Sequence, residues 1–238
     1  MQNRPASRGF FITGTDTGVG KTLIAGALAK ALTATGRRVG VMKPFESGCR
    51  RENGQLIPAD ALFLKKMAGA TDDLSLICPY ALARPLAPGV AAQAEKIVID
   101  IETITTAFAR IAARYDLVLV EGAGGLMVPI TQQLLTADLI RLLDLPVIII
   151  ARTTLGTINH TLLTVKQAQS EGLEVRGIIL NKLSAAADEA EETNPAVLEK
   201  FSHVPLLGVV PYIPAKDRQN PELLSSLVCA HLDLSLLQ

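Results

Sequence analysis

Short apolar runs alternate along the chain with longer segments in which apolar residues recur every three or four positions. The short runs are typical of buried strands, and the longer segments are typical of helices that cover a sheet. Their alternation predicts βαβ units, and therefore an α/β fold with a doubly wound, mostly parallel sheet and helices on both faces. The expected strands are Gly9–Thr13, Val39–Lys43, Leu117–Glu121, Val147–Ala151, Gly177–Asn181 and Leu207–Val210.

Helical spacing of apolar residues predicts the segments that connect these strands. No internal repeat, low-complexity tract or linker divides the sequence, and 238 residues with 49% hydrophobic content suffice for one large core. We therefore expect a single domain over residues 1–238. The expected helices are Thr22–Thr35, Asp60–Ala68, Ile101–Arg114, Thr136–Leu143, Thr157–Gln169 and Ala187–Phe201.

A glycine-rich stretch, Gly14-Thr-Asp-Thr-Gly-Val-Gly-Lys-Thr22, joins the first expected strand to the first expected helix. Backbone N–H groups in such a turn, together with the helix N-terminus, can bind a triphosphate. Lys21 would reach the outer phosphates, and the Thr22 hydroxyl would bind Mg²⁺. Five residues separate Gly14 from Gly20, against the usual four, so the loop is a longer variant. The alternative is a glycine-rich turn with an accidental Gly-Lys-Thr.

Ligands of doubly wound sheets lie beyond the carboxyl ends of the strands, where several polar residues stand in this sequence. Lys43 ends the second strand and could add a second positive charge to a transferring phosphoryl group, with Ser47 as a nearby donor. The alternative for Lys43 is a surface lysine before a proline turn. Asp60 could be a Mg²⁺ ligand, or it could cap the helix that it opens.

Glu121 ends the third expected strand and is followed by Gly-Ala-Gly-Gly125. A buried strand that ends in an acidic residue matches the second element of nucleotide sites, where the carboxylate holds Mg²⁺ directly or through water. The glycines allow the backbone to approach a ligand closely. A structural role would leave an unpaired carboxylate at the end of a buried strand, which is costly, so the site interpretation is favoured.

Two further loops follow later strands. In Ala151–Thr161, free N–H groups at a helix start and the side chains of Thr157 and Asn159 could bind a carboxylate or phosphate, although an ordinary N-cap is the alternative. Asn181 could pair with the donor and acceptor of an adenine edge. A guanine site would require a carboxylate just downstream, where Ser184 stands, so adenine is favoured.

Charge and cysteine usage narrow the range of partners. Twenty-three basic and 23 acidic residues leave no net charge, which gives no reason to expect nucleic acid or a membrane as partner. The N-terminus lacks the apolar core of a signal peptide, and no apolar run approaches the roughly 20 residues of a membrane span. Cys49, Cys78 and Cys229 have no zinc-site spacing. We expect a cytoplasmic protein with buried free thiols and small-molecule ligands.

Taken together, these motifs resemble the dethiobiotin synthetases over most of the chain. The resemblance is carried by the long phosphate loop, Lys43-Pro with Ser47-Gly48, Asp60-Ala-Leu62, Glu121-Gly-Ala-Gly-Gly125 and Leu155-Gly-Thr-Ile-Asn-His-Thr161. It implies a homodimer with the active site at the interface. It also implies ring closure of 7,8-diaminononanoate with CO₂ to dethiobiotin, dependent on ATP and Mg²⁺, through a carbamate and a carbamic-phosphoric mixed anhydride.

The resemblance also implies roles for the matching residues. Lys43 and Lys21 would be catalytic, and Thr22, Asp60 and Glu121 would hold Mg²⁺. The diamine would contact Thr17 and Ser47, and its distal carboxylate would bind Gly156, Thr157, Ile158 and Asn159 across the dimer interface. The nucleotide with its metal would contact Gly18, Val19, Gly20, Lys21, Thr22, Asp60, Glu121, Gly122, Ala123, Gly124 and Asn181, with Val210, Pro211 and Tyr212 enclosing the adenine.

The sequence departs from the family pattern at two positions. Gly18 stands where some members carry Glu, and Gly89 stands where His is common, so the details of the substrate pocket differ. A second class of protein, a dimeric ParA/MinD-like ATPase switch, shares the expected sheet and loop. Such switches usually carry a lysine five residues before the loop lysine, where this chain has Asp16, so the ligase interpretation is favoured.

Overall fold

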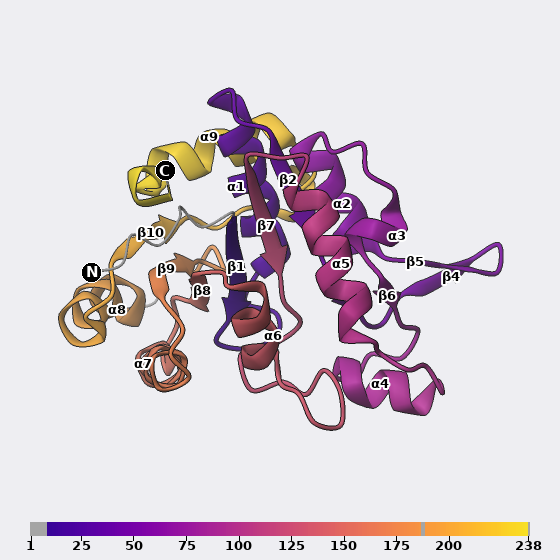
Figure 1. The fold of residues 1–238 in the computed structure, drawn as a ribbon. Coiled ribbons are helices and arrows are strands. Elements are labelled where there is room, and N and C mark those ends of the chain that lie inside the picture. The colour runs from indigo at the N-terminus through magenta and orange to yellow at the C-terminus, as the bar shows by residue number, and fades with distance from the viewer. Residues whose placement is uncertain (1–8, 187–188, 238) are drawn as a thin grey trace.

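A six-stranded parallel sheet forms the centre of the protein in a computed structural model, which describes residues 9–186 and 189–237 (Figure 1). The strand order is β10-β9-β8-β1-β7-β2. Burial on both faces explains why the central strands are almost continuously apolar in sequence. The strands are β1 (Gly9–Gly14), β2 (Val39–Met42), β7 (Leu117–Glu121), β8 (Val147–Arg152), β9 (Val175–Asn181) and β10 (Leu206–Val210).

Two layers of helices cover the sheet. Alternate strand residues face opposite layers, so that Ile12 packs in one core cluster and Phe11 in the other. One layer contains α1 (Lys21–Ala34), α2 (Ala59–Ala68) and α9 (Pro221–His231). The other contains α5 (Ile101–Ala112), α6 (Thr136–Leu143), α7 (Thr157–Ser170) and α8 (Glu189–Ser202).

The predicted fold class is confirmed, and all six predicted strands form within two residues of their expected bounds. Five of the six predicted helices form close to their expected limits. The sixth begins at Glu189, and the first two residues of its predicted span, 187 and 188, lie outside the described residues.

Helix α9 was not predicted, although its start carries a recognisable signal. The Asn220 side chain accepts a hydrogen bond from Leu223 N at 3.2 Å, and Pro221 occupies the first helical position. The sequence also did not predict the short elements α3 (Leu74–Ile77), α4 (Pro88–Ala94), β3 (Phe45–Glu46), β4 (Arg50–Glu52), β5 (Gln55–Ile57), β6 (Tyr80–Ala81) and the 3₁₀ turns Ala215–Asp217 and Leu234–Leu237.

Among the described residues, no helix has the length and apolar character needed to cross a membrane. Cys49 and Cys78 are buried as expected. The expectation is wrong for Cys229, which is exposed. Cys229 lies on the outer side of α9, whereas Leu224 and Val228 of the same helix pack into the core against α1.

The topology places one crevice at the carboxyl end of β1. The chain leaves β1 for β2 on one side of the sheet, whereas β8, β9 and β10 lie on the other side. In open α/β sheets such a reversal of strand order marks the usual ligand site. The glycine-rich loop lies at this point, between β1 and α1.

Candidate active site

The loop between β1 and α1 has the backbone geometry of an anion-binding turn. Gly18 and Gly20 adopt left-handed conformations with φ of 78° and 92°. Gly20 is the N-cap of α1, and no side chain caps this helix, so its first N–H groups are available to a ligand. A Cβ on Gly20 would lie 2.2 Å from Asn181 Nδ2, which is a second reason for glycine at this position.

Lys21 begins α1, and its buried ammonium group folds back over the loop. Its Nζ donates to the Asp16 carbonyl oxygen at 3.1 Å. Burial and the nearby charge of Lys43 lower the pKa of Lys21 to about 8, against the opposing effect of the Glu121 and Asp60 carboxylates. The Asp16 side chain accepts from Thr17 N at 2.7 Å, so this residue stabilises the turn itself.

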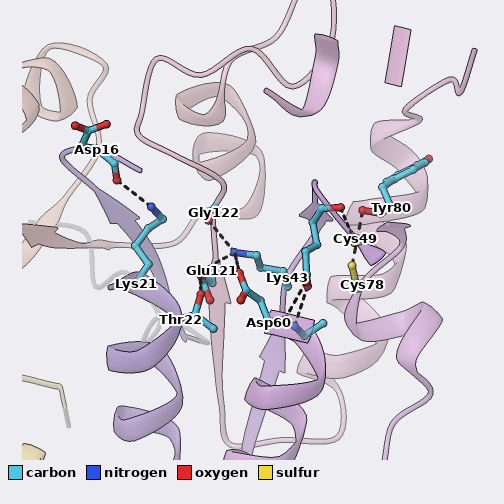
Figure 2. A network of polar contacts seen from close by, with 12 residues as sticks. Asp16, Lys21, Thr22, Lys43, Cys49, Asp60, Cys78, Tyr80, Glu121 and Gly122 are labelled. Carbon is cyan, nitrogen blue, oxygen red and sulfur yellow. Dashed lines mark hydrogen bonds and ion pairs between the residues drawn. The ribbon is translucent and has the colours of Figure 1, made fainter. Parts of the chain in front are cut away.

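A cluster of charged groups meets beside the loop, as Figure 2 shows. Lys43 follows β2 directly and is only 4% exposed, so it is not a surface lysine. Its Nζ donates to Glu121 Oε1 at 2.6 Å and lies 3.3 Å from Asp60 Oδ2. Thr22 Oγ1 donates to the same Glu121 oxygen at 2.8 Å. Four elements far apart in sequence, α1, the end of β2, α2 and β7, thus supply one cluster around Glu121.

The carboxylates of this cluster keep Lys43 charged. Burial alone would lower the pKa of Lys43, but the attraction of Glu121 and Asp60 outweighs it and raises that pKa above its usual value. Glu121 Oε2 is buried and makes no hydrogen bond to the described residues. An acceptor oxygen of this kind is costly unless a ligand, metal ion or water satisfies it.

Asp60 does not cap helix α2, so the N-cap alternative is wrong. Pro58 occupies the N-cap position and offers no side-chain hydrogen bond. The buried carboxylate of Glu46 caps the helix instead, since it accepts from Asp60 N at 2.9 Å and from Ala61 N at 3.0 Å. The Asp60 side chain is therefore free to pair with Lys43. No role for Glu46 was predicted from the sequence, where its one signal is a carboxylate three residues after Lys43.

A cavity of about 390 Å³ contains most of the predicted site. It holds two lysines and three carboxylates, which leaves one net negative charge before any ligand binds. Leu23, Phe45 and Glu46 line it although they were not predicted to. The predicted residues that line it are Thr17, Gly18, Gly20, Lys21, Thr22, Lys43, Ser47, Asp60, Glu121, Ala123 and Gly124.

The predicted adenine contacts lie next to the loop, outside this cavity. Asn181 is buried, and its Nδ2 donates to Val19 O at 2.9 Å. Val210 is the register partner of Asn181 on the neighbouring strand, and Pro211 and Tyr212 follow it. Gly122, also outside the lining, accepts a long hydrogen bond of 3.4 Å from Lys43 Nζ.

Residues Gly156–Asn159 do not enter the cavity of their own chain. Gly156 is the N-cap of α7 with φ of 90°, and no side chain caps this helix. The Thr157 hydroxyl points inward and donates to Arg152 O at 2.6 Å, whereas Asn159 is exposed. The exposed backbone of this turn, rather than the Thr157 side chain, is what a ligand could reach.

The oxygen ligands present suit Mg²⁺ held jointly with a nucleotide. No group of three or more His, Cys, Asp or Glu residues that could hold a metal occurs in the described part of the chain. Asp60, Glu121 and the Thr22 hydroxyl offer oxygen atoms at one point of the cavity, including the unsatisfied Glu121 Oε2. Mg²⁺ typically binds one or two carboxylates and completes its shell with phosphate and water, so the residues fit this ion.

The fold and the site together define a P-loop nucleotide-binding α/β protein. Two solved structures share the fold at 17% identity. The ParA family ATPase from Chlorobium tepidum has a TM-score of 0.55 over 94% of this chain and 93% of that one. The septum site-determining protein MinD from Pyrococcus horikoshii, complexed with Mg-ADP, has a TM-score of 0.56 over 89% and 85%.

Sequence comparisons identify the family. The sequence model of a family described as an AAA domain matches residues 8–220. The ATP-dependent dethiobiotin synthetase BioD of Thermodesulfovibrio yellowstonii is 46% identical over 213 residues, covering 86% of this chain and 89% of that protein. The same enzyme of Bacillus subtilis strain 168 is 44% identical over 230 residues and 97% of each chain. The chain belongs to the family of ATP-dependent dethiobiotin synthetases and is an ATP-dependent ligase.

Proposed function

We propose that this chain closes the ureido ring of dethiobiotin from 7,8-diaminononanoate and CO₂, with hydrolysis of Mg-ATP. The observation that carries the proposal is the cluster of Lys43, Glu121, Thr22 and Asp60 beside the phosphate-binding loop. The same cavity contains Thr17 and Ser47, which gives a second substrate room and hydroxyl groups next to the phosphates.

The reaction needs positioning and charge neutralisation more than a side-chain nucleophile. One amine attacks CO₂ and loses a proton, which gives a carbamate. A carbamate oxygen attacks the γ-phosphorus, ADP leaves, and a mixed anhydride forms. The second amine then attacks the carbonyl carbon, and phosphate leaves as the ring closes.

Each lysine has a separate part in these steps. Lys21 and the N–H groups of the loop bind the outer phosphates, and Lys43 neutralises charge on the carbamate and the transferring phosphoryl group. When bound, Mg²⁺ would neutralise part of the charge of the phosphates. Thr22, Asp60 and Glu121 are the residues that would hold it. Asn181 and Val210–Tyr212 would enclose the adenine.

A homodimer would complete the site. Gly156–Asn159 lie outside their own chain's cavity, so the N–H groups left free at this helix start would serve a substrate carboxylate in another subunit. Apolar side chains are exposed beside this turn and beside the loop, with Leu155 82% exposed and Leu163 and Met127 more than half exposed. Leu163 and Met127 also line an open hollow that includes Thr15–Thr17 of the phosphate loop. A partner subunit on this face would bury these side chains.

Purified protein supplied with Mg-ATP, bicarbonate and the diamine is expected to release one phosphate for each cyclic urea formed. Omission of the diamine should stop both products, because the phosphoryl acceptor is made from it. Phosphate assay and mass spectrometry measure the two. Phosphate release that ignores the diamine, or that rises only with DNA or membrane vesicles, would instead indicate a ParA/MinD-like switch.

Binding of ATP without metal is expected to take up protons above pH 8. The pKa of Lys21 is lowered to about 8 in the ligand-free protein, so the lysine is mostly neutral at pH 9. Phosphate oxygens favour its charged form, and the uptake should approach one proton at pH 9 and vanish below about pH 7. Calorimetry in two buffers of different ionisation enthalpy measures it. Lys21→Arg, which stays charged, should abolish the uptake; the same uptake in that variant would refute the assignment.

A further inference from the structure

The buried carboxylate of Glu46 is the only side-chain cap on helix α2 among the described residues. Glu46 lies 14 and 15 positions before the two residues whose N–H groups it accepts, Asp60 and Ala61. Each of its oxygens takes one of these hydrogen bonds. A negative charge at a helix N-terminus also interacts favourably with the helix dipole. The start of α2 is thus held by a residue from another element.

The backbone of Glu46 is itself fixed. Strand β3 pairs in parallel with β6, with Glu46 opposite Ala81. The Glu46 carbonyl oxygen accepts from Leu82 N at 2.7 Å and from Cys49 Sγ at 3.2 Å. A hydrogen-bonded short strand therefore carries the carboxylate that caps the start of α2.

The consequence falls on Asp60. An N-cap residue commonly satisfies free N–H groups with its own side chain, but Pro58, the N-cap of α2, has no side chain that can accept. Glu46 satisfies Asp60 N and Ala61 N instead, and the Asp60 carboxylate lies 3.3 Å from Lys43 Nζ. Without the Glu46 cap, the first turn of α2 would lose the acceptor that fixes the position of Asp60.

We propose that Glu46 is a positioning residue that holds the start of α2 and thereby directs the Asp60 carboxylate toward the bound metal ion. The inference rests on the metal role proposed for Asp60. Glu46 is assigned no contact with substrate or metal; it acts through Asp60.

The test measures how much Mg²⁺ tightens ATP binding. The Kd of ATP is determined by calorimetry in chelator and in saturating Mg²⁺ for the full chain and its variants. Glu46→Gln removes the charge and one of the two acceptor oxygens, whereas Glu46→Asp keeps the charge but is too short to reach both N–H groups. Both should lower the Mg²⁺ enhancement by about ten-fold, the equivalent of one charge-assisted hydrogen bond. Metal-free ATP affinity should be unchanged.

Two comparisons separate positioning from other effects. Glu95 is a matched control, because its carboxylate also accepts two backbone N–H groups, from Ala83 and Arg84, away from the site. Glu95→Gln should leave the enhancement unchanged. A normal enhancement in Glu46→Asp, or an equal loss in Glu95→Gln, would overturn the proposal.

Asp60→Asn distinguishes this inference from the proposed metal site. If Asp60→Asn leaves the enhancement intact, the metal role of Asp60 itself fails. If Asp60→Asn lowers the enhancement, the double variant with Glu46→Asp should lose less than about two-fold more than Asp60→Asn alone. The reason is that both substitutions act through the Asp60 carboxylate. Additive losses would show that Glu46 acts independently of Asp60.

Discussion

Replacement of Lys43 by Ala is expected to lower kcat for phosphate release by about 10²–10³-fold, while ATP still binds. Removal of one preorganised charge or donor from a developing anion typically costs that much, about 3–4 kcal/mol. The ammonium of Lys43 is held in place by Glu121 at 2.6 Å, so it needs no rearrangement during the reaction. Lys21 and the loop amides remain to bind the phosphates. Steady-state kinetics and calorimetric Kd for ATP give the two quantities.

The variant also breaks a buried ion pair, and a control must account for this effect. Removal of one partner of such a pair can cost about 3–5 kcal/mol of stability. Arg114 and Asp72 form an ion pair at the opposite end of the sheet in which the carboxylate is equally buried, with Asp72 only 1% exposed although Arg114 is 55% exposed, and with Arg114 Nη1 2.5 Å from Asp72 Oδ1. Arg114→Ala should lower stability with kcat unchanged. Retained turnover in Lys43→Ala, or equal loss of kcat in Arg114→Ala, would contradict the role of Lys43.

The fold was predictable because its strands are buried on both faces. In β7, every residue from Leu117 to Glu121 is buried, so the run is apolar up to its final carboxylate. Helix α9 shows where the pattern was insufficient. It packs on α1 after a connection that contains the 3₁₀ turn Ala215–Asp217, and it carries His231 and the exposed Cys229, which dilute its apolar spacing. The cap at Asn220 and Pro221 was the stronger signal.

The members of the site were predictable because the carboxyl ends of parallel strands meet at one edge. This rule alone places Lys43, Glu121 and the loop together before any contact is known. The contacts themselves were not predictable. Capping of α2 by Glu46 joins segments from different parts of the chain, and the inward turn of the Thr157 hydroxyl depends on the Arg152 carbonyl. Sequence spacing carries no information on either pairing.

Fold similarity alone does not separate a ligase from a switch ATPase, since ParA and MinD proteins share this sheet at TM-scores of 0.55 and 0.56. The loop is more informative. Asp16 provides a carbonyl for Lys21 and a carboxylate for Thr17 N, so it supports the turn and brings no cation to it. The second cation of the cavity is Lys43, from the neighbouring strand.

Replacement of Glu121 by Gln is expected to lower Mg²⁺-dependent turnover by about 10²-fold or more and to raise the Mg²⁺ concentration needed for half-maximal rate. Gln keeps one acceptor oxygen for Thr22 and Lys43. It removes the negative charge that attracts the metal ion. It also replaces the unsatisfied Glu121 Oε2 with either an NH₂ group or a neutral oxygen. Loss of an electrostatic contribution to phosphoryl transfer is commonly of this size. Rates measured across a Mg²⁺ titration test both effects.

Asp72→Asn is the matched control for this change, because the two carboxylates are equally buried and accept from the same kinds of donor. The side chains of Asp72 and Glu121 are each 1% exposed. Each carboxylate accepts from one basic group, Arg114 for Asp72 and Lys43 for Glu121. Each also accepts from one hydroxyl group, that of Tyr115 for Asp72 and that of Thr22 for Glu121. Both substitutions should lower the free energy of unfolding by about 1–3 kcal/mol. Only Glu121→Gln should shift the Mg²⁺ dependence. An unchanged Mg²⁺ dependence in Glu121→Gln would restrict Glu121 to holding Lys43, and the metal would then depend on Asp60 and the phosphates alone.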